Sequence, residues 1–370
     1  MIFCHNCFVD HEIQDIIIGL GNKGICPICG KQDSFLYDTD NNSDLTELFE
    51  SLIEIYTPLS LLPSNFPNEN SQLLKDELKH NWNIFNKQIS NAKIYQVMKS
   101  VCSELYDTNP KLFNEPIVIK EFYNSEYMKN NSIIKDNNWE RFVNCIKYES
   151  RFHVDCISPK IFDDFFNLSK INYEAGQVFY RARISDEKGF MNFNDITAPP
   201  KEKMKNGRAN PEGIRCLYLA NDIETTIHEV RANIFDHITI GKFVLQNNIT
   251  LVNFKQIGNI SPFVVNDLTK YAINRPVLAK INNEIAKSVS RNDSVLTYLP
   301  TQYICDYIKS IWDNDRQANK YDGIEYSSTT CPDGYNIAIF NPDIFKCIGT
   351  EIYKINSINY KKEKISTNYS

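Results

Sequence analysis

The sequence predicts an α+β protein in three parts: a small cysteine-rich domain, an all-α domain, and a larger mixed domain that carries the chemistry. Two Cys-x-x-Cys pairs stand within the first 29 residues. Helical spacing of apolar residues then dominates, and strand-like alternation begins near residue 176. We therefore expect domains at residues 1–38, 39–160 and 165–355, followed by a polar tail at 356–370.

The composition is that of an ordinary globular chain. Its 370 residues are 42% hydrophobic and 23% charged, which excludes a disordered polymer or a fibre. The formal net charge of -6 argues against binding nucleic acid or an anionic membrane through bulk electrostatics. No apolar run is long enough to span a membrane, and no signal peptide pattern follows Met1. With 11 cysteines and no export signal, we expect the reducing cytoplasm.

The two Cys-x-x-Cys pairs predict a zinc ribbon. An 18-residue gap separates them, and we expect a hairpin with its tip near Gly19, Gly21 and Gly24 to bring the pairs together. Four thiolates leave no coordination position for water, so the Zn²⁺ would be structural. The alternative is that these cysteines are redox-active or merely buried. The expected ligands are Cys4, Cys7, Cys26 and Cys29.

The middle of the chain is predicted to be helical. Apolar residues recur at helical spacing from 45 to 53, and further helices are expected at about 72–86, 92–105 and 139–148. An RNA-cutting helical domain usually carries an arginine followed a few residues later by a histidine. The pair Arg151 and His153 is too closely spaced for that pattern, and His80 has no arginine ahead of it on its helix. We therefore expect a binding, sensing or scaffolding domain.

The C-terminal part opens with a strand-like segment at 178–183. Alternation places Phe179, Arg181 and Arg183 on one face of this strand. Two neighbouring arginines suit a diphosphate, because each guanidinium offers a fork of donors to phosphate oxygens. The alternative is a solvated strand face.

A glycine- and proline-shaped loop at 207–213 follows and leads into a short strand with Tyr218. Residues 221–224 have capping-box spacing and are expected to open a helix. Its apolar stripe is formed by Ile223, Ile227 and Val230. Glu229 lies off that stripe, where a glutamate is most often an exposed carboxylate.

A last cluster, at 322–328, is predicted to be a turn that feeds a strand, with Tyr326 and Ser328 on one face. Together with the loop and helix before it, and with Asn-Ile-x-x-Phe-Asn-Pro at 336–342, it resembles the RES family, named for its arginine, glutamate and serine. The matching positions are Arg208, Glu229 and Ser328, with Tyr218 and Arg181 matching two further family residues. The resemblance covers about residues 170–350.

The resemblance implies a fold similar to ADP-ribosyltransferases of the diphtheria-toxin type, and an enzyme that degrades NAD+ by hydrolysis or phosphorolysis as a toxin or defence effector. It implies Arg208, Glu229 and Ser328 as catalytic residues. The residues expected to bind NAD+ are Arg181, Arg183, Asn210, Tyr218 and Ser327. Because Ser327 and Ser328 are adjacent, either could be the serine of the family motif. We prefer Ser328, because the family has one residue between the tyrosine and the serine, as between Tyr326 and Ser328.

The chemistry fits these residue types. Breaking the bond between nicotinamide and ribose passes through an oxocarbenium-like state, which needs a carboxylate near the ribose and cations at the diphosphate. Glu229 can supply the first, and Arg208 with Arg181 the second.

The front half resembles the N-terminal module of some RES proteins, in which two Cys-x-x-Cys pairs precede a HEPN-like helical domain. An antitoxin or regulatory protein, or a second copy of the chain, is the expected partner, since free NAD+ cleavage would harm the host cell. Three alternatives stay open: an ADP-ribosyltransferase acting on a macromolecule, a HEPN-type ribonuclease, and a binding protein without enzymatic activity.

Overall fold

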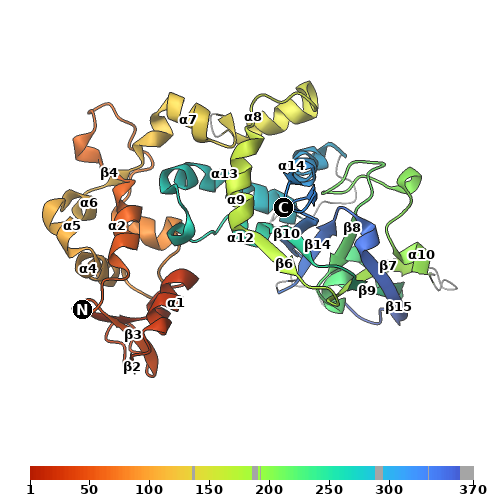
Figure 1. Ribbon diagram of the computed structural model, residues 1–370, viewed down its shortest axis with the longest axis horizontal. Coiled ribbons are helices and arrows are strands. Elements are labelled where there is room, and N and C mark those ends of the chain that lie inside the picture. The colour runs from red at the N-terminus through yellow and green to blue at the C-terminus, as the bar shows by residue number, and fades with distance from the viewer. Residues whose placement is uncertain (136–137, 186–190, 192, 288–294, 332, 359–370) are drawn as a thin grey trace, which may run out of the picture. The chain divides into compact units, whose positions relative to one another are not determined.

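In the computed structural model the chain forms two compact units (Figure 1). The first comprises Met1–Asn138 and Asn259–Leu278, and the second comprises Trp139–Gly258 and Ala279–Ser370. The structure describes residues 1–135, 138–185, 191, 193–287, 295–331 and 333–358. Most of the expected polar tail therefore lies outside the described residues.

The first unit begins with a small antiparallel sheet of strand order β1-β3-β2. The segment between the two cysteine pairs, expected as a hairpin, also contains the helix α1. Asp10 caps this helix by accepting hydrogen bonds from the amides of Glu12 and Ile13, and Ile13 and Ile17 are buried one turn apart. The elements here are β1 Ile2–Cys4, η1 His5–Cys7, α1 His11–Gly19, β2 Lys23–Gly24 and β3 Ser34–Asp38.

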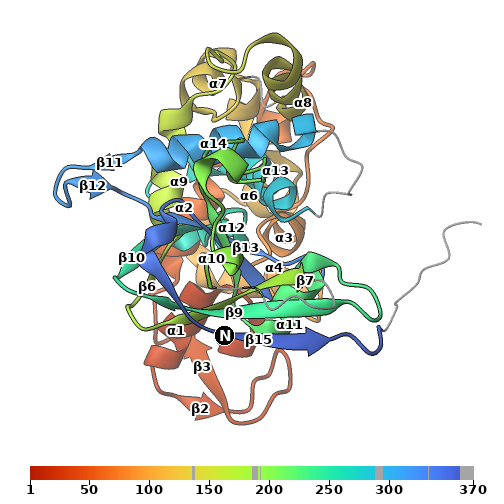
Figure 2. The same ribbon diagram turned by 90° about the vertical axis from the view of Figure 1, so that its right-hand side faces the viewer.

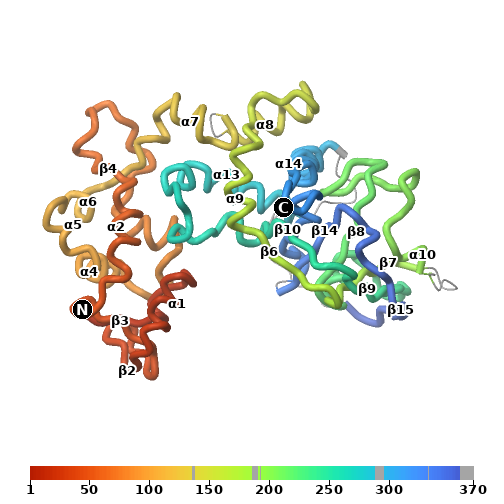
Figure 3. Tube along the Cα trace, in the orientation of Figure 1, coloured from red at the N-terminus to blue at the C-terminus, as the bar shows by residue number. Residues whose placement is uncertain are grey.

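The rest of the first unit is mainly helical, and Figure 3 traces its path. The helix expected at 72–86 is shorter than predicted, because it passes into a π-helix that ends at Asn81 and Asn83 is left-handed with φ 55°. The elements are α2 Thr46–Glu54, β4 Thr57–Pro58, η2 Leu59–Leu61, α3 Leu74–Asp76, η3 Glu77–Asn81, α4 Asn91–Val101, α5 Ser103–Thr108, α6 Lys111–Asn114, β5 Ile117–Val118, η4 Lys120–Tyr123, α7 Ser125–Asn131, η9 Pro262–Val264 and the first turns of α13 Leu268–Ala286.

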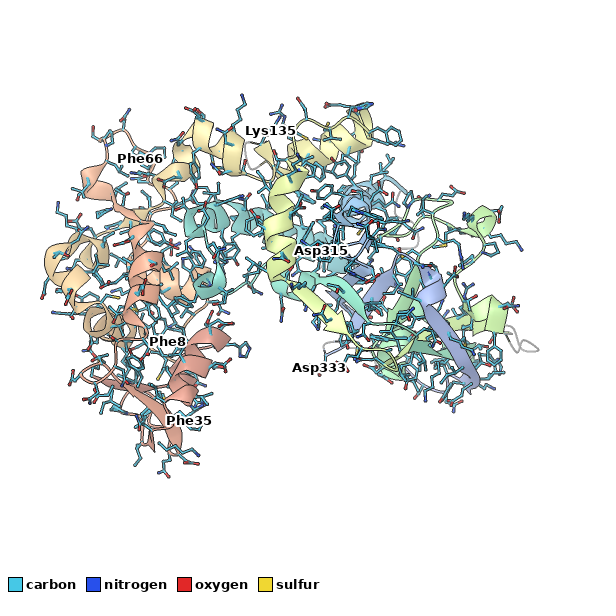
Figure 4. The ribbon with its side chains drawn as sticks, viewed as in Figure 1. Phe8, Phe35, Phe66, Lys135, Asp315 and Asp333 are labelled. Atoms are coloured by element: carbon cyan, nitrogen blue, oxygen red, sulfur yellow. The ribbon has the colours of Figure 1, made fainter. Side chains whose placement is uncertain are left out.

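Aromatic packing ties the first unit together. Phe8, labelled in Figure 4, is buried with its ring centroid 4.7 Å from that of Phe85. Phe263, from the second stretch of the chain in this unit, packs edge-on against Phe49 at 5.0 Å. Residues 259–278 therefore contribute core contacts to this unit although they are distant from it in sequence.

The second unit is built on an eight-stranded sheet of order β15-β9-β7-β8-β14-β13-β10-β6. Figure 2 shows β15, β9 and β7 side by side, as their antiparallel registers require. The strands are β6 Lys170–Tyr173, β7 Val178–Ser185, β8 Leu217–Ala220, β9 His237–Leu245, β10 Ile249–Asn253, β13 Gly323–Ser327, β14 Tyr335–Ile339 and β15 Phe345–Lys354, and β11 Trp312–Asp313 with β12 Ala318–Asn319 forms a separate hairpin.

Helices cover this sheet and connect its strands. They are α8 Trp139–Asn144, η6 Cys145–Glu149, η7 Pro159–Ile161, α9 Phe162–Leu168, α10 Phe193–Ile196, η8 Lys201–Lys203, α11 Ile223–Val230, α12 Phe254–Ile257, the last turns of α13, η10 Val295–Tyr298, α14 Leu299–Ser310 and η11 Pro342–Ile344. The segment at 139–148, expected as part of the middle domain, is helical as predicted and belongs to this unit. Among the described residues, no helix combines the length and apolar character needed to cross a membrane.

The two faces of the sheet bury different clusters. One face holds Phe179, Leu217, Phe243 and Ile337 among its core residues. On the other, Ala182 and its neighbours pack against the predicted apolar stripe of α11, namely Ile223, Ile227 and Val230. The amide of Ala182 also donates a 2.8 Å hydrogen bond to Thr226 Oγ1, so α11 is held to β7 by both apolar and polar contacts.

Candidate active site

Glu229 stands in the last turn of α11, and three side chains donate hydrogen bonds to one of its oxygens. Ser328 Oγ lies 2.7 Å from Glu229 Oε1, Asn336 Nδ2 lies 2.9 Å from it, and Thr330 Oγ1 lies 3.4 Å from it. The glutamate is exposed, whereas Ser328 and Asn336 are buried. An exposed carboxylate is thus held through Oε1 by mainly buried partners, and Oε2 has no hydrogen-bond partner among the described residues.

Ser328 is oriented so that its hydroxyl hydrogen points at Glu229. The amides of Thr330 and Cys331 both donate to Ser328 Oγ, at 3.3 and 3.2 Å. Because these bonds occupy the acceptor side of the oxygen, the hydroxyl serves as donor to the carboxylate. Ser327 pairs with Tyr335 on the opposite face of β13, so Ser328 is the serine that reaches Glu229.

The turn after β13 is shaped to bring Ser328 to α11. The amide of Ser328 donates to the carbonyl of Gly334 at 2.9 Å, which closes the loop. Gly334 packs directly against the side chain of Thr225, and a Cβ atom there would clash with it. Thr225 in turn is held by the N-cap Asp222, whose Oδ1 accepts from the Thr225 amide at 2.7 Å.

Tyr326 and Arg208 extend the site along the same face of the sheet. Tyr326 pairs directly with Asn336 across β13 and β14, so both side chains share the face of Glu229. The guanidinium carbon of Arg208 lies 4.9 Å from the centroid of the Tyr326 ring. Burial raises the pKa of Tyr326, which keeps the phenol neutral beneath the cation.

Arg208 is further held by the end of α13. Its Nη1 donates to the carbonyl of Ile285, and its Nη2 donates to that of Lys287 at 3.2 Å. Carbonyls at a helix C-terminus lack intrahelical partners and attract cations. The half-buried guanidinium is therefore positioned by two segments, β13 and the end of α13, and keeps further N–H groups for a ligand.

The loop at 207–213 is pinned to Tyr218. The phenol donates to Asn210 Oδ1 at 2.7 Å and accepts from the amide of Ala209 at 3.0 Å. Gln302, on α14, donates to the carbonyls of Gly207 and Asn210 at 2.8 Å each. Asn210 is 1% exposed and its amide is used within the loop, so it shapes the loop that presents Arg208.

The structure does not bring Arg181 and Arg183 together with Glu229. Both arise from the face of β7 that carries Phe179, opposite the face on which α11 packs. Arg183 Nη2 donates to the carbonyl of Thr197 at 3.1 Å, and Arg181 Nη1 donates to that of Tyr218 at 3.2 Å. Burial, with a smaller effect from Arg183, lowers the pKa of Arg181 to about 10.

Three residues at this site, Tyr326, Thr330 and Asn336, were not among the expected site residues. Tyr326 and Asn336 both fall within motifs noted in the sequence, but alternation alone does not distinguish a site residue from a core residue. The signal for Tyr326 is its position two residues before Ser328 on one strand face. The role of Asn336 depends on strand pairing with β13, which the sequence does not reveal.

The expected zinc ligands do converge in the first unit. The sulfur atoms of Cys4, Cys7, Cys26 and Cys29 all lie within 4.8 Å of one another, and three of these residues are buried. Cys4 Sγ is 3.5 Å from Cys29 Sγ, and Cys7 Sγ is 3.7 Å from Cys26 Sγ. A tetrahedral zinc with bonds of about 2.3 Å places its sulfurs about 3.8 Å apart. The cluster therefore has the donor set and spacing to hold a metal ion.

Replacing one thiol should remove the metal. We expect the wild-type protein, purified under reducing conditions with zinc supplied, to carry about one metal ion per chain. Cys26→Ser should carry much less, because a hydroxyl is a poor substitute for a thiolate ligand. Cys347→Ser, at a half-buried thiol in β15, is the control and should keep the wild-type content. Elemental analysis checks this; a metal-free wild type would contradict the assignment.

Gly207→Ala should loosen the loop that presents Arg208. A Cβ at this position would overlap the hydroxyl of Tyr218 and the amide of Asn210, so we expect a loss of about 1–3 kcal/mol in the free energy of unfolding. Gly349→Ala is the matched control, because nothing lies within 4 Å of its added methyl group. Urea denaturation measures both, and equal midpoints for the two variants would contradict this account of the loop.

The family model described as "RES domain" matches residues 178–355. No curated protein and no solved structure matched the chain. The matched region contains Arg208, Tyr218, Glu229, Ser328 and Asn336, so the described site lies inside the part of the chain that matches the RES domain.

Proposed function

We propose that the second unit cleaves the bond between nicotinamide and ribose in NAD+. The observation that carries this proposal is the 2.7 Å hydrogen bond from Ser328 Oγ to Glu229 Oε1, within a region that matches the RES domain. The RES family is associated with activity on NAD+, and the site has the charges that this reaction requires.

Glu229 is proposed to stabilise the ribose as the bond to nicotinamide breaks. The departing nicotinamide leaves positive charge on the ribose, so a fixed carboxylate lowers the free energy of the transition state. Ser328, Thr330 and Asn336 donate to Oε1, and Oε2 is the oxygen proposed to face the ribose. Because the carboxylate is held before the substrate arrives, it need not reorganise during the reaction.

Arg208 is proposed to bind the diphosphate of NAD+. Its guanidinium lies on the Tyr326 ring and is anchored by helix carbonyls, which fixes its remaining donors in one direction. Tyr218 is half-buried beside this loop, and its ring is the proposed surface for nicotinamide. Arg181 and Arg183, which the sequence predicted to bind NAD+, lie on the other face of β7 and are not included in this proposed site.

Hydrolysis, phosphorolysis and ADP-ribosyl transfer differ only in the group that attacks the ribose carbon. Water at the ribose carbon gives ADP-ribose, phosphate gives its phosphorylated form, and a side chain or base of a macromolecule gives a covalent ADP-ribose adduct. We propose that a small nucleophile is used. A protein with this activity would act as a toxin or defence effector in the cytoplasm, restrained by its first unit, by an antitoxin or regulatory protein, or by a second copy.

The cysteine cluster is proposed to hold Zn²⁺ as a structural ion. Four thiolates satisfy tetrahedral zinc and leave no position for water, so the ion would fix the first 38 residues and take no part in the reaction. The helical part that follows is proposed to be HEPN-like and regulatory.

Glu229→Gln should abolish most of the turnover. The amide keeps the size of the side chain but removes the negative charge, so we expect nicotinamide release to fall by about 10²–10³-fold. Glu224→Gln is the matched control on the same helix; its side chain is 72% exposed and pairs only with His228 among the described residues, so activity should stay within about twofold. Chromatography of NAD+ and nicotinamide, with and without phosphate, gives both rates.

Equal loss in the two variants, or unchanged turnover in Glu229→Gln, would contradict the proposed role of Glu229. The wild type should also be assayed with added phosphate, and with cell extract, which supplies both a trigger and acceptors. If it releases no nicotinamide under any of these conditions, the NAD+ proposal itself is overturned. ADP-ribose found attached to protein or nucleic acid would assign the reaction to a transferase instead.

A further inference from the structure

The first unit contains a basic hollow that the proposed NAD+ site does not use. Its volume is about 630 Å³, within the range of small-ligand sites. Among the described residues that line it there is no carboxylate. The lining residues are Lys79, His80, Asn81, Asn83, Lys87, Asn259 and Arg275.

The wall of the hollow is held by a buried tryptophan. The π-helix η3 ends at Asn81, and Trp82, 6% exposed, donates from its indole nitrogen to the Tyr56 hydroxyl at 2.7 Å. Asn83 then adopts its left-handed conformation, which turns the chain toward Lys87. π-Helical turns such as η3 occur often at functional sites.

Two cations of the hollow are fixed in advance. Lys79 Nζ donates to the carbonyl of Ile89 at 2.7 Å and to Asn91 Oδ1 at 3.2 Å, which leaves one ammonium hydrogen for a ligand. The Arg275 guanidinium carbon lies 4.8 Å from the Trp82 ring centroid. Its Nε is buried and has no hydrogen-bond partner among the described residues, so this donor is desolvated without compensation.

Glu77, which is close in sequence to Lys79 and His80, forms its hydrogen bonds with other side chains. Glu77 is 7% exposed, accepts from Tyr56 and Asn81, and does not line the hollow. Burial raises the pKa of Glu77, although the charge of Arg275 opposes this in part. Lys79, Lys87 and Arg275 therefore bring positive charge to a hollow that no carboxylate lines among the described residues.

We propose that this hollow binds a small ligand that carries two or more phosphate groups. Lysine and arginine supply the charge, and the three asparagine amides supply neutral donors for phosphate oxygens. Apart from the His80 imidazole, no aromatic ring is among the described lining residues, so the ligand would be recognised mainly through its phosphates. The binding site is independent of the proposed NAD+ cleavage, because all its residues belong to the first unit.

Titration calorimetry of the full chain with inorganic tripolyphosphate tests the site. We expect saturable binding that weakens as salt is added. Lys87→Gln combined with His80→Gln changes two exposed side chains and should weaken binding at least tenfold, as should Arg275→Gln if that variant keeps the wild-type melting temperature. Lys129→Gln, an exposed lysine of α7 outside the hollow, is the matched control and should bind within twofold of wild type.

Arg208→Gln shows which site is responsible. Retained tripolyphosphate binding in Arg208→Gln, with loss in the double variant at His80 and Lys87, would support the hollow. Loss in Arg208→Gln with full binding in the double variant would place the ligand at the candidate NAD+ site and overturn the inference. Absence of binding to the wild type at millimolar tripolyphosphate would also overturn it. ATP as a second probe should bind no more tightly than tripolyphosphate if phosphate alone is recognised.

Discussion

The site depends on the hydrogen bond by which Ser328 holds Glu229 across 99 residues of sequence. Glu229 occupies the last turn of α11, just before Arg231 ends the helix in a left-handed conformation. A carboxylate there faces the negative end of the helix dipole, which costs about 0.3–1 kcal/mol. Three donors to Oε1 offset that cost and give the exposed carboxylate a fixed direction. Such local conflict with helix preferences is expected where a residue serves function.

The remaining architecture brings the other charged and aromatic groups to the same face. Tyr326 pairs directly with Asn336, the residue whose side-chain amide donates to Glu229. The Tyr326 ring therefore lies beside this donor, and Arg208 lies on the ring. Gln302 and Tyr218 tie down the loop that carries Arg208 from two directions. The cation and the carboxylate are thus positioned by hydrogen bonds among protein groups, so little ordering is left for the substrate to impose.

Sequence patterns predicted those features of the fold that depend on residues close together in the chain. The apolar stripe of α11, the strand at 178–183 and the convergence of the four cysteines all follow from periodicity or spacing, and the structure agrees. The preference for Ser328 over Ser327 rests on the family's spacing after tyrosine and stays a prediction. The RES match at 178–355 agrees with the motifs that suggested the family. Patterns of this kind did not predict the helix α1 between the cysteine pairs, because glycines near residues 19–24 indicate a turn without showing how much helix precedes it.

Other features depend on long-range pairing that a single sequence does not contain. Arg181 and Arg183 were correctly placed on one strand face, but which face meets α11 is decided by the packing of Ala182 against Ile223 and Ile227. The role of Asn336 depends in the same way on strand order.

A structure of the Glu229→Gln variant with NAD+ tests the central claim most directly, since that variant should bind the substrate without consuming it. The account predicts the ribose carbon that bears nicotinamide beside residue 229, with the diphosphate at Arg208. Ordered NAD+ elsewhere on the chain, with Arg208, residue 229 and Ser328 free of it, would contradict it.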